Sequence, residues 1–104
     1  MALEVTDGNI SDVLTQNQIT VLDFWAQWCG PCRMIGPVID NLANENTDIT
    51  IGKVNVDENS AITVQYGIRG IPAIIFFKDG NEVDRIVGVK SQAELQAKID
   101  SLKP

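Results

Sequence analysis

One stretch decides the fold of this chain, and it runs from Ile19 to Pro37 as ITVLDFWAQWCGPCRMIGP. An apolar run at its start predicts a buried strand over residues 19–26, and apolar residues at helical spacing then predict a helix over residues 31–44. Pro31 suits the first turn of that helix, because proline lacks the N–H group that would have no partner there. Pro37 lies inside the helix and is expected to kink it, since it removes one backbone hydrogen bond.

Both cysteines of the chain, Cys29 and Cys32, lie where this strand meets this helix. Cys29 falls at the helix N-terminus, where unpaired N–H groups and the helix dipole favour a negative charge. We therefore expect this position to stabilise the thiolate of Cys29. Cys32 follows three residues later on the same face, so the pair can close into a disulfide and reopen by thiol–disulfide exchange.

Three roles are open to such a cysteine pair. A structural disulfide fits poorly, because the stabilisation by a disulfide grows with loop length and this loop is minimal. Zinc needs four ligands, whereas the chain has two cysteines and no histidine, so a zinc site would require two chains. Redox exchange fits best, because Trp28 and Pro31 flank the cysteines at a helix start. We expect no metal and, without a phosphate-binding loop, no bound cofactor.

Composition and charge narrow the function further. The 104 residues suffice for one domain with one core, which we expect to span residues 1–104. The net charge is -6 and the eight basic residues are scattered, which argues against nucleic acid or an anionic membrane as partner. The N-terminus shows no signal-peptide pattern and no run is long and apolar enough to span a membrane. We expect a cytoplasmic monomer.

The rest of the chain alternates between strand and helix patterns. Strands are expected at residues 3–5, 49–56, 73–77 and 82–87. One helix is expected after a cap at Asp7 or Asn9, a second over residues 59–65, and a third after a capping box at Ser91. Asp79-Gly80 predicts a hairpin between the last two strands. Two parallel units followed by a hairpin predict an α/β protein with one mixed sheet and helices on both faces.

The sequence resembles the thioredoxin family over essentially its full length. The residues that carry this resemblance are Asp23-Phe24-Trp25-Ala26, Trp28-Cys29-Gly30-Pro31-Cys32, Pro37, Lys53, Asp57, Gly70-Ile71-Pro72 and Gly88. The chain departs from the common family pattern at Gln27, Gly36 and Ala73. The resemblance implies a thioredoxin fold, with a central mixed five-stranded sheet flanked by four helices. It also implies a protein-disulfide reductase that a flavin-containing thioredoxin reductase recharges with electrons from NADPH.

Asp23 is a carboxylate in the middle of an apolar strand. Burial raises the pKa of such a group, because desolvation disfavours its charged form, and the group can then pass protons near neutral pH. The resemblance implies that Asp23 serves Cys32, through a water molecule. A structural aspartate bonded to the backbone is the alternative. Lys53 has the strand parity of an inward residue and is a candidate partner of Asp23, unless its ammonium group reaches solvent.

Small and apolar residues are expected to form a rim around Cys29, on which the extended backbone of a protein substrate can lie. This apolar rim consists of Trp28, Gly30, Pro31, Ile71, Pro72, Val87, Gly88 and Val89. Ile71 can offer backbone hydrogen bonds to the substrate, as in strand addition. For Val87 and Val89, ordinary packing at a strand end is the alternative. The resemblance implies a cis peptide bond between Ile71 and Pro72, facing the cysteines.

The predicted mechanism is dithiol–disulfide exchange with protein substrates. Cys29 attacks a substrate disulfide, and Cys32, deprotonated with help from Asp23, resolves the mixed disulfide. One rival is a disulfide oxidase or isomerase, against which Gly30-Pro31 and the missing signal peptide argue. A second rival is a clamp subunit that docks the apolar rim onto a larger enzyme without redox change. Removing both cysteines separates these classes, because a clamp would keep working.

Overall fold

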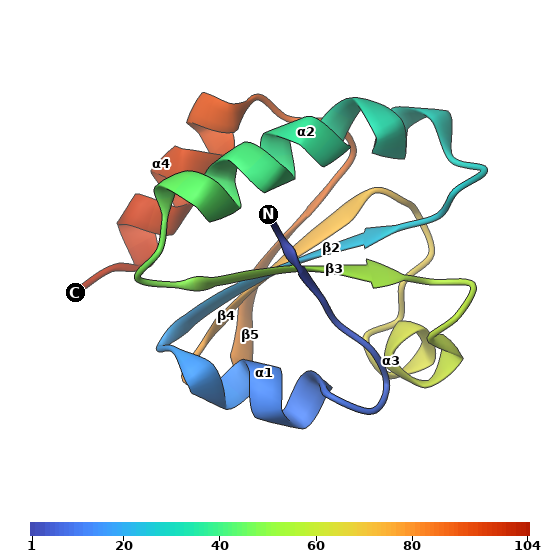
Figure 1. Cartoon of the computed structure of the whole chain (residues 1–104), viewed down its shortest axis with the longest axis horizontal. Helices are drawn as coiled ribbons and strands as arrows, with labels where there is room; N and C mark the ends of the chain where they lie inside the picture. Colours follow the sequence, from blue (N-terminus) through green and yellow to red (C-terminus); the bar gives the residue numbers. More distant parts are fainter.

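Five strands form one mixed sheet in the order β1-β3-β2-β4-β5, seen in a computed structural model that describes residues 1–104 (Figure 1). β3 pairs in parallel with β1 and β2, whereas β4 is antiparallel to both β2 and β5. The strands are β1 (Leu3–Glu4), β2 (Ile19–Trp25), β3 (Thr50–Asn55), β4 (Ala73–Lys78) and β5 (Asn81–Val87). The helices are α1 (Ile10–Gln16), α2 (Gly30–Glu45), α3 (Ser60–Gln65) and α4 (Gln92–Leu102). The predicted five-stranded mixed sheet with four helices is confirmed.

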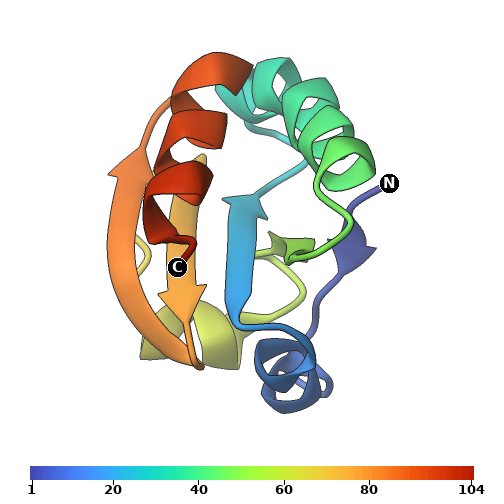
Figure 2. The ribbon, with the colours of Figure 1, turned by 90° about the vertical axis from the view of Figure 1, so that its left-hand side faces the viewer.

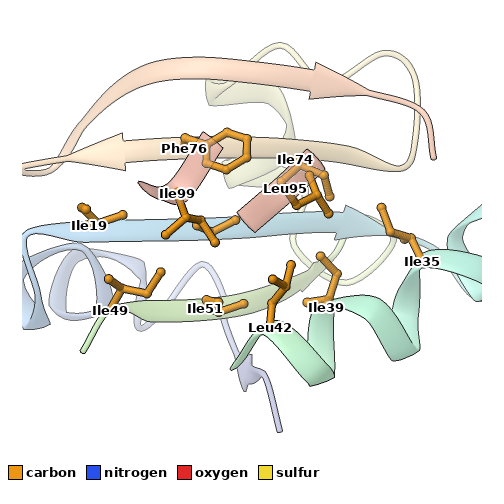
Figure 3. Packing of buried hydrophobic residues seen from close by; sticks show 11 residues of the cluster. Ile19, Ile35, Ile39, Leu42, Ile49, Ile51, Ile74, Phe76, Leu95 and Ile99 are labelled. Carbon is orange, nitrogen blue, oxygen red and sulfur yellow. The ribbon is translucent and has the colours of Figure 1, made fainter. Parts of the chain in front are cut away.

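Two helices cover each face of the sheet: α2 and α4 lie on one side, and α1 and α3 on the other (Figures 1 and 2). The α2/α4 side buries an apolar cluster that includes Ile35 and Ile39 of α2 and Val21 and Phe76 of the sheet; its buried members are drawn in Figure 3. A second cluster, which includes Phe24, lies on the other side. Each large apolar side chain buried in this way contributes about 1.5–3 kcal/mol. The first cluster holds α2 against the sheet, because it contains Ile35, Ile39 and Leu42 of that helix.

The central strand β2 positions the chemistry. All its residues except Trp25 are buried, because helices cover both of its faces, and this explains its nearly continuous apolar sequence. Successive side chains alternate between the faces, so Asp23 shares the α2/α4 side with Ile19 and Val21. The carboxyl end of β2 leads directly into the turn before α2. The cysteines thus lie at the C-terminal end of the central strand, and Asp23 lies two residues before the end of that strand.

Most predicted boundaries agree with the structure within one or two residues. Asp79 and Gly80 form the predicted hairpin turn, with φ angles of 53° and 83°. The capping box of α4 is also confirmed, because the Glu94 N–H donates to Ser91 Oγ at 3.1 Å and the Ser91 N–H donates to Glu94 Oε1 at 3.3 Å. Pro37 lies inside α2, which still runs as a single helix of 16 residues.

Asn9 occupies the cap position of α1, as predicted, but its side chain does not cap the helix. Its side-chain oxygen accepts a hydrogen bond from the Thr6 N–H at 2.8 Å. Asp7 instead accepts the N–H groups of Ala61 and Ile62 at the start of α3, at 3.3 and 2.9 Å. The carboxylate of Asp7 therefore caps a helix that lies more than fifty residues away, which local sequence patterns do not reveal.

Gly36 offers a test of how far α2 can be stabilised. It lies inside the helix, and a β-carbon added there would meet nothing within 4 Å. Gly36→Ala is expected to raise the free energy of unfolding by about 0.5–1 kcal/mol, because alanine is the better helix former. Denaturant unfolding measures this change. Gly88→Ala, at φ 102°, is the control and should destabilise; a loss of stability in Gly36→Ala would contradict the packing described here.

Candidate active site

The first turn of α2 carries the two cysteines. Cys29 is the N-cap residue of α2, and Pro31 lies within the first two helical positions. A disulfide joins Cys29 to Cys32, and the backbone N–H of Cys32 donates to the sulfur of Cys29 at 3.2 Å. When the disulfide is open, the same N–H group and the helix start favour a thiolate on Cys29.

The two cysteines are almost equally buried, but their sulfur atoms have different neighbours. Cys29 is 5% exposed and Cys32 is 4% exposed, so exposure alone does not separate their roles. The sulfur of Cys29 lies 3.8 Å from the carbonyl oxygen of Ile71, on the side of the apolar rim. Cys32 lines a cavity of about 150 Å³ that it shares with Asp23. One cysteine therefore faces the rim, and the other faces the buried acid.

Asp23 is buried as the sequence predicted, with 1% of its surface exposed. Burial raises its pKa to about 7, a shift that the positive charge of Lys53 reduces and the negative charge of Asp40 increases. No protein group donates a hydrogen bond to Asp23 Oδ1. In a purely structural aspartate, a hydrogen-bond donor would be expected at that oxygen. The arrangement therefore favours a carboxyl group that exchanges a proton with a group in the cavity.

Lys53 has a different direct partner from the predicted one. It lies opposite Asp23 in the parallel register of β2 and β3, and both side chains line the cavity of Cys32. Its ammonium group, however, pairs with Asp40 of α2 at 3.2 Å. Partial burial opposes ionisation of Asp40, but hydrogen bonds from the Ala2 N–H and from Lys53 hold its pKa below the usual value. The ammonium group thus binds the charged carboxylate rather than the buried acid.

Hydrogen bonds and packing connect several of the predicted rim residues to one another and to the cysteines. Ile71 packs against the small cluster that Ala26 forms with the two cysteines. The Gly88 N–H donates to the carbonyl oxygen of Pro72 at 2.8 Å, which ties the loop after β5 to the loop before β4. The peptide bond between Ile71 and Pro72 is cis, and Pro72 itself is buried. The other rim residues are exposed or half-buried; they are Trp28, Gly30, Pro31, Ile71, Val87, Gly88 and Val89.

Val87 and Val89 are not buried at the end of β5. Val87 is 58% exposed and Val89 is 42% exposed. Trp28 is 69% exposed as well. Water-exposed apolar side chains gathered near a reactive group are typical of a surface that binds another molecule.

Asp57 belongs to the site in a way that the sequence did not predict. The indole N–H of Trp28 donates to Asp57 Oδ2 at 2.9 Å and so holds the exposed ring beside the cysteines. The two residues are far apart in the sequence, and no local pattern connects them. Asp40 was missed for the same reason, since an acidic residue on an amphipathic helix normally indicates only a solvated face.

This hydrogen bond predicts a local effect. Asp57→Ala should release the Trp28 ring, change its fluorescence and slow disulfide exchange several-fold, because the ring no longer has a fixed orientation. The free energy of unfolding should change by less than about 1 kcal/mol, since the contact is exposed. Asp57→Asn keeps an oxygen acceptor and is the matched control. If Asp57→Ala and Asp57→Asn both exchanged disulfides as fast as the wild type, this contact would have no role in the reaction.

Two general features complete the description. No group of three or more histidine, cysteine, aspartate or glutamate side chains is placed to hold a metal ion. None of the helices combines the length and apolar character that a membrane crossing needs.

Comparison with known proteins gives one answer. The family model described as Thioredoxin matches residues 1–101. Thioredoxin 1 of Synechococcus elongatus is 45% identical over 102 residues, covering 96% of this chain and 95% of its own. Thioredoxin of Mycobacterium tuberculosis is 42% identical over 104 residues, covering 98% of this chain and 90% of its own.

The same similarity holds in three dimensions. The solved structure of a mutant thioredoxin from Halobacterium salinarum superimposes with a TM-score of 0.90 at 40% identity, covering 99% of this chain and 94% of that one. Fold, sequence and the Cys29–Cys32 disulfide agree. This chain belongs to the thioredoxin family of thiol–disulfide oxidoreductases.

Proposed function

We propose that Cys29 is the nucleophile of this protein-disulfide reductase, that Cys32 is the resolving thiol, and that Asp23 accepts the proton of Cys32. One observation carries the assignment: the cavity beside the disulfide contains Cys32 and the buried carboxyl group of Asp23, but not Cys29. A carboxyl group with a pKa of about 7 is matched to proton transfer at neutral pH.

The steps follow from this arrangement. The Cys29 thiolate attacks one sulfur of the substrate disulfide, the substrate S–S bond breaks, and the other substrate sulfur leaves as a thiolate. The thiol of Cys32 then gives its proton to the carboxylate of Asp23 and attacks the sulfur of Cys29. The bond between Cys29 and the substrate breaks, and the second substrate thiolate leaves. The substrate has gained two electrons, and the chain is left with its own disulfide.

The apolar rim is proposed as the surface that binds the substrate. Trp28 supplies a flat exposed face, and its hydrogen bond to Asp57 limits the entropy lost on binding. Gly30 and Gly88 have no side chain to keep a substrate backbone away from Cys29. Further support comes from Pro31, Ile71 and Pro72. Lys53 is proposed to support the site through its charge near Asp23.

Recycling and context form a further part of the proposal. We infer from family membership that a flavin-containing thioredoxin reductase uses NADPH to reopen the Cys29–Cys32 disulfide. Residues 1–104 are proposed to act as one domain and as a monomer in the cytoplasm. Neither nucleic acid nor a membrane is proposed as a partner, because acidic residues outnumber basic ones by 14 to 8.

The clamp function remains a second candidate, because most of the apolar rim is exposed and docking onto a partner needs no electron transfer. The test is reduction of insulin disulfides with NADPH and a thioredoxin reductase from a relative. The wild type should reduce insulin and consume NADPH, and the Cys29→Ser/Cys32→Ser double variant should do neither. The proposed function would be contradicted if the wild type did not reduce insulin and if NADPH and the reductase did not open its Cys29–Cys32 disulfide.

A further inference from the structure

Asp40 joins three parts of the molecule from the middle of α2. Both of its carboxylate oxygens lie 3.2 Å from the ammonium nitrogen of Lys53, which comes from β3. Its Oδ1 also accepts the backbone N–H of Ala2 at 3.1 Å. Asp40 is half-buried, so these contacts are only partly screened by water.

Lys53 stands between two cavities. The first, of about 150 Å³, contains Asp23 and Cys32. The second, of about 260 Å³, contains Asp40 and lies toward the N-terminal residues. Lys53 and Trp25 line both cavities, whereas Asp23 lines only the first and Asp40 only the second. The ion pair therefore draws the ammonium group toward the second cavity.

Few other charges reach Asp23. Helix α2 contributes Cys32 and Arg33 to the cavity of Asp23, and the charge of its Asp40 also acts on Asp23. Arg33 donates a hydrogen bond to the carbonyl oxygen of Gln27 at 2.9 Å. The β4 residue opposite Asp23 is the apolar Ile74, and the residues that α4 buries on this side of the sheet are Leu95 and Ile99. β3 contributes Lys53. Its ammonium group is therefore the cation best placed to pair with Asp23 if Asp40 releases it.

We propose that Asp40 is a positioning residue for disulfide exchange, which holds the Lys53 ammonium group away from Asp23 so that the buried carboxyl group stays free to accept the proton of Cys32. A cation in direct contact with a carboxylate favours the charged form and makes it a weaker base. Asp40 acts against this, by binding the cation and by its own negative charge. The inference rests on the proposed role of Asp23.

The first test is Asp40→Asn, followed by NMR titration of the Asp23 carboxyl carbon in the disulfide form, where no free thiol titrates. Asparagine still offers an oxygen to the Ala2 N–H but no negative charge to Lys53. The pKa of Asp23 should fall by about half a unit or more. Asp84→Asn, which removes a similarly exposed carboxylate from its ion pair with Lys98, is the matched control and should leave this pKa unchanged. An unchanged pKa in Asp40→Asn overturns the proposal.

A double-mutant cycle then separates positioning from simple repulsion between two acids. In the Lys53→Gln background there is no ammonium group to hold, so Asp40→Asn should lower the pKa of Asp23 by clearly less than it does in the wild type. Equal shifts in both backgrounds would mean that Asp40 acts only through its own charge, which overturns the positioning role.

Activity provides a separate readout. In Asp40→Asn, the midpoint of the pH dependence of mixed-disulfide resolution should move down together with the NMR titration of Asp23. A midpoint that stays at the wild-type value while the NMR titration moves would overturn the link between Asp40 and exchange. The NMR experiment needs no substrate, so failure of the proposed function would show in the insulin assay, independently of the result for Asp40.

Discussion

Cys32→Ser is expected to attack disulfide substrates and then to remain covalently attached to them, whereas Cys29→Ser is expected not to attack at all. The reason is the position of Cys29 at the start of α2, where the Cys32 N–H lies 3.2 Å from its sulfur and the helix dipole favours a thiolate. Turnover in both variants should fall by at least about 10³-fold, since each lacks one obligatory half of the exchange.

Thiol trapping followed by mass spectrometry measures this difference. A mixed disulfide should accumulate in Cys32→Ser through Cys29, and none should accumulate in Cys29→Ser. Ser91→Ala, far from the cysteines in sequence and at the cap of α4, serves as a control for nonspecific loss of structure and should turn over normally. Trapping through Cys32 in the Cys29→Ser variant would reverse the assignment of the two roles.

Asp23→Asn is expected to stabilise the fold at neutral pH while slowing exchange. The folded protein holds the carboxyl proton up to a pKa of about 7, whereas the unfolded chain releases it near the ordinary aspartate pKa of 3.8. The stability contributed by this proton is therefore complete below the unfolded value and is lost as the pH rises through the folded value. Asparagine is neutral at every pH, so the variant does not lose stability as the pH rises.

The size of this effect follows from the same shift. Above pH 7 the variant should be more stable than the wild type by on the order of 4 kcal/mol, since the pKa shift from 3.8 to about 7 spans about three units and each unit corresponds to about 1.4 kcal/mol. Near pH 4 the difference should be small. Denaturant unfolding at several pH values gives the profile. Asp84→Asn is a control of opposite sign and should not gain stability at neutral pH, because a hydrogen bond donated by Lys98 holds the pKa of Asp84 below the usual value. Equal stability of Asp23→Asn and wild type at pH 8 would contradict a buried neutral acid.

The fold was predictable because its signals are local. The continuous apolar run of β2 requires cover on both faces, and the positions of Asp79-Gly80 and Ser91 require a turn and a helix start. The cysteine pair and Asp23 were found for the same reason, since a charge inside a buried strand is conspicuous in the sequence.

The missed contacts all join residues that are distant in the sequence. Asp7 caps α3 rather than α1, Asp57 holds Trp28, and Asp40 pairs with the ammonium group of Lys53, for which the sequence offers Asp23 as a candidate partner. In each case a surface carboxylate acquires its role from a second element that packing brings near. A sequence pattern shows such a residue only as one charge among the 14 acidic residues of the chain.

The most direct test of the mechanism is the rate at which Cys32 resolves a preformed mixed disulfide on Cys29, measured in a single turnover across the neutral pH range. In the wild type this rate should rise with pH around a midpoint near the Asp23 pKa of about 7, as the carboxylate becomes able to accept the proton. In Asp23→Asn the rate at pH 7 should fall by about tenfold or more, and the step at that midpoint should disappear. The same rate and the same pH profile in both proteins would contradict the role of Asp23 on which this account depends.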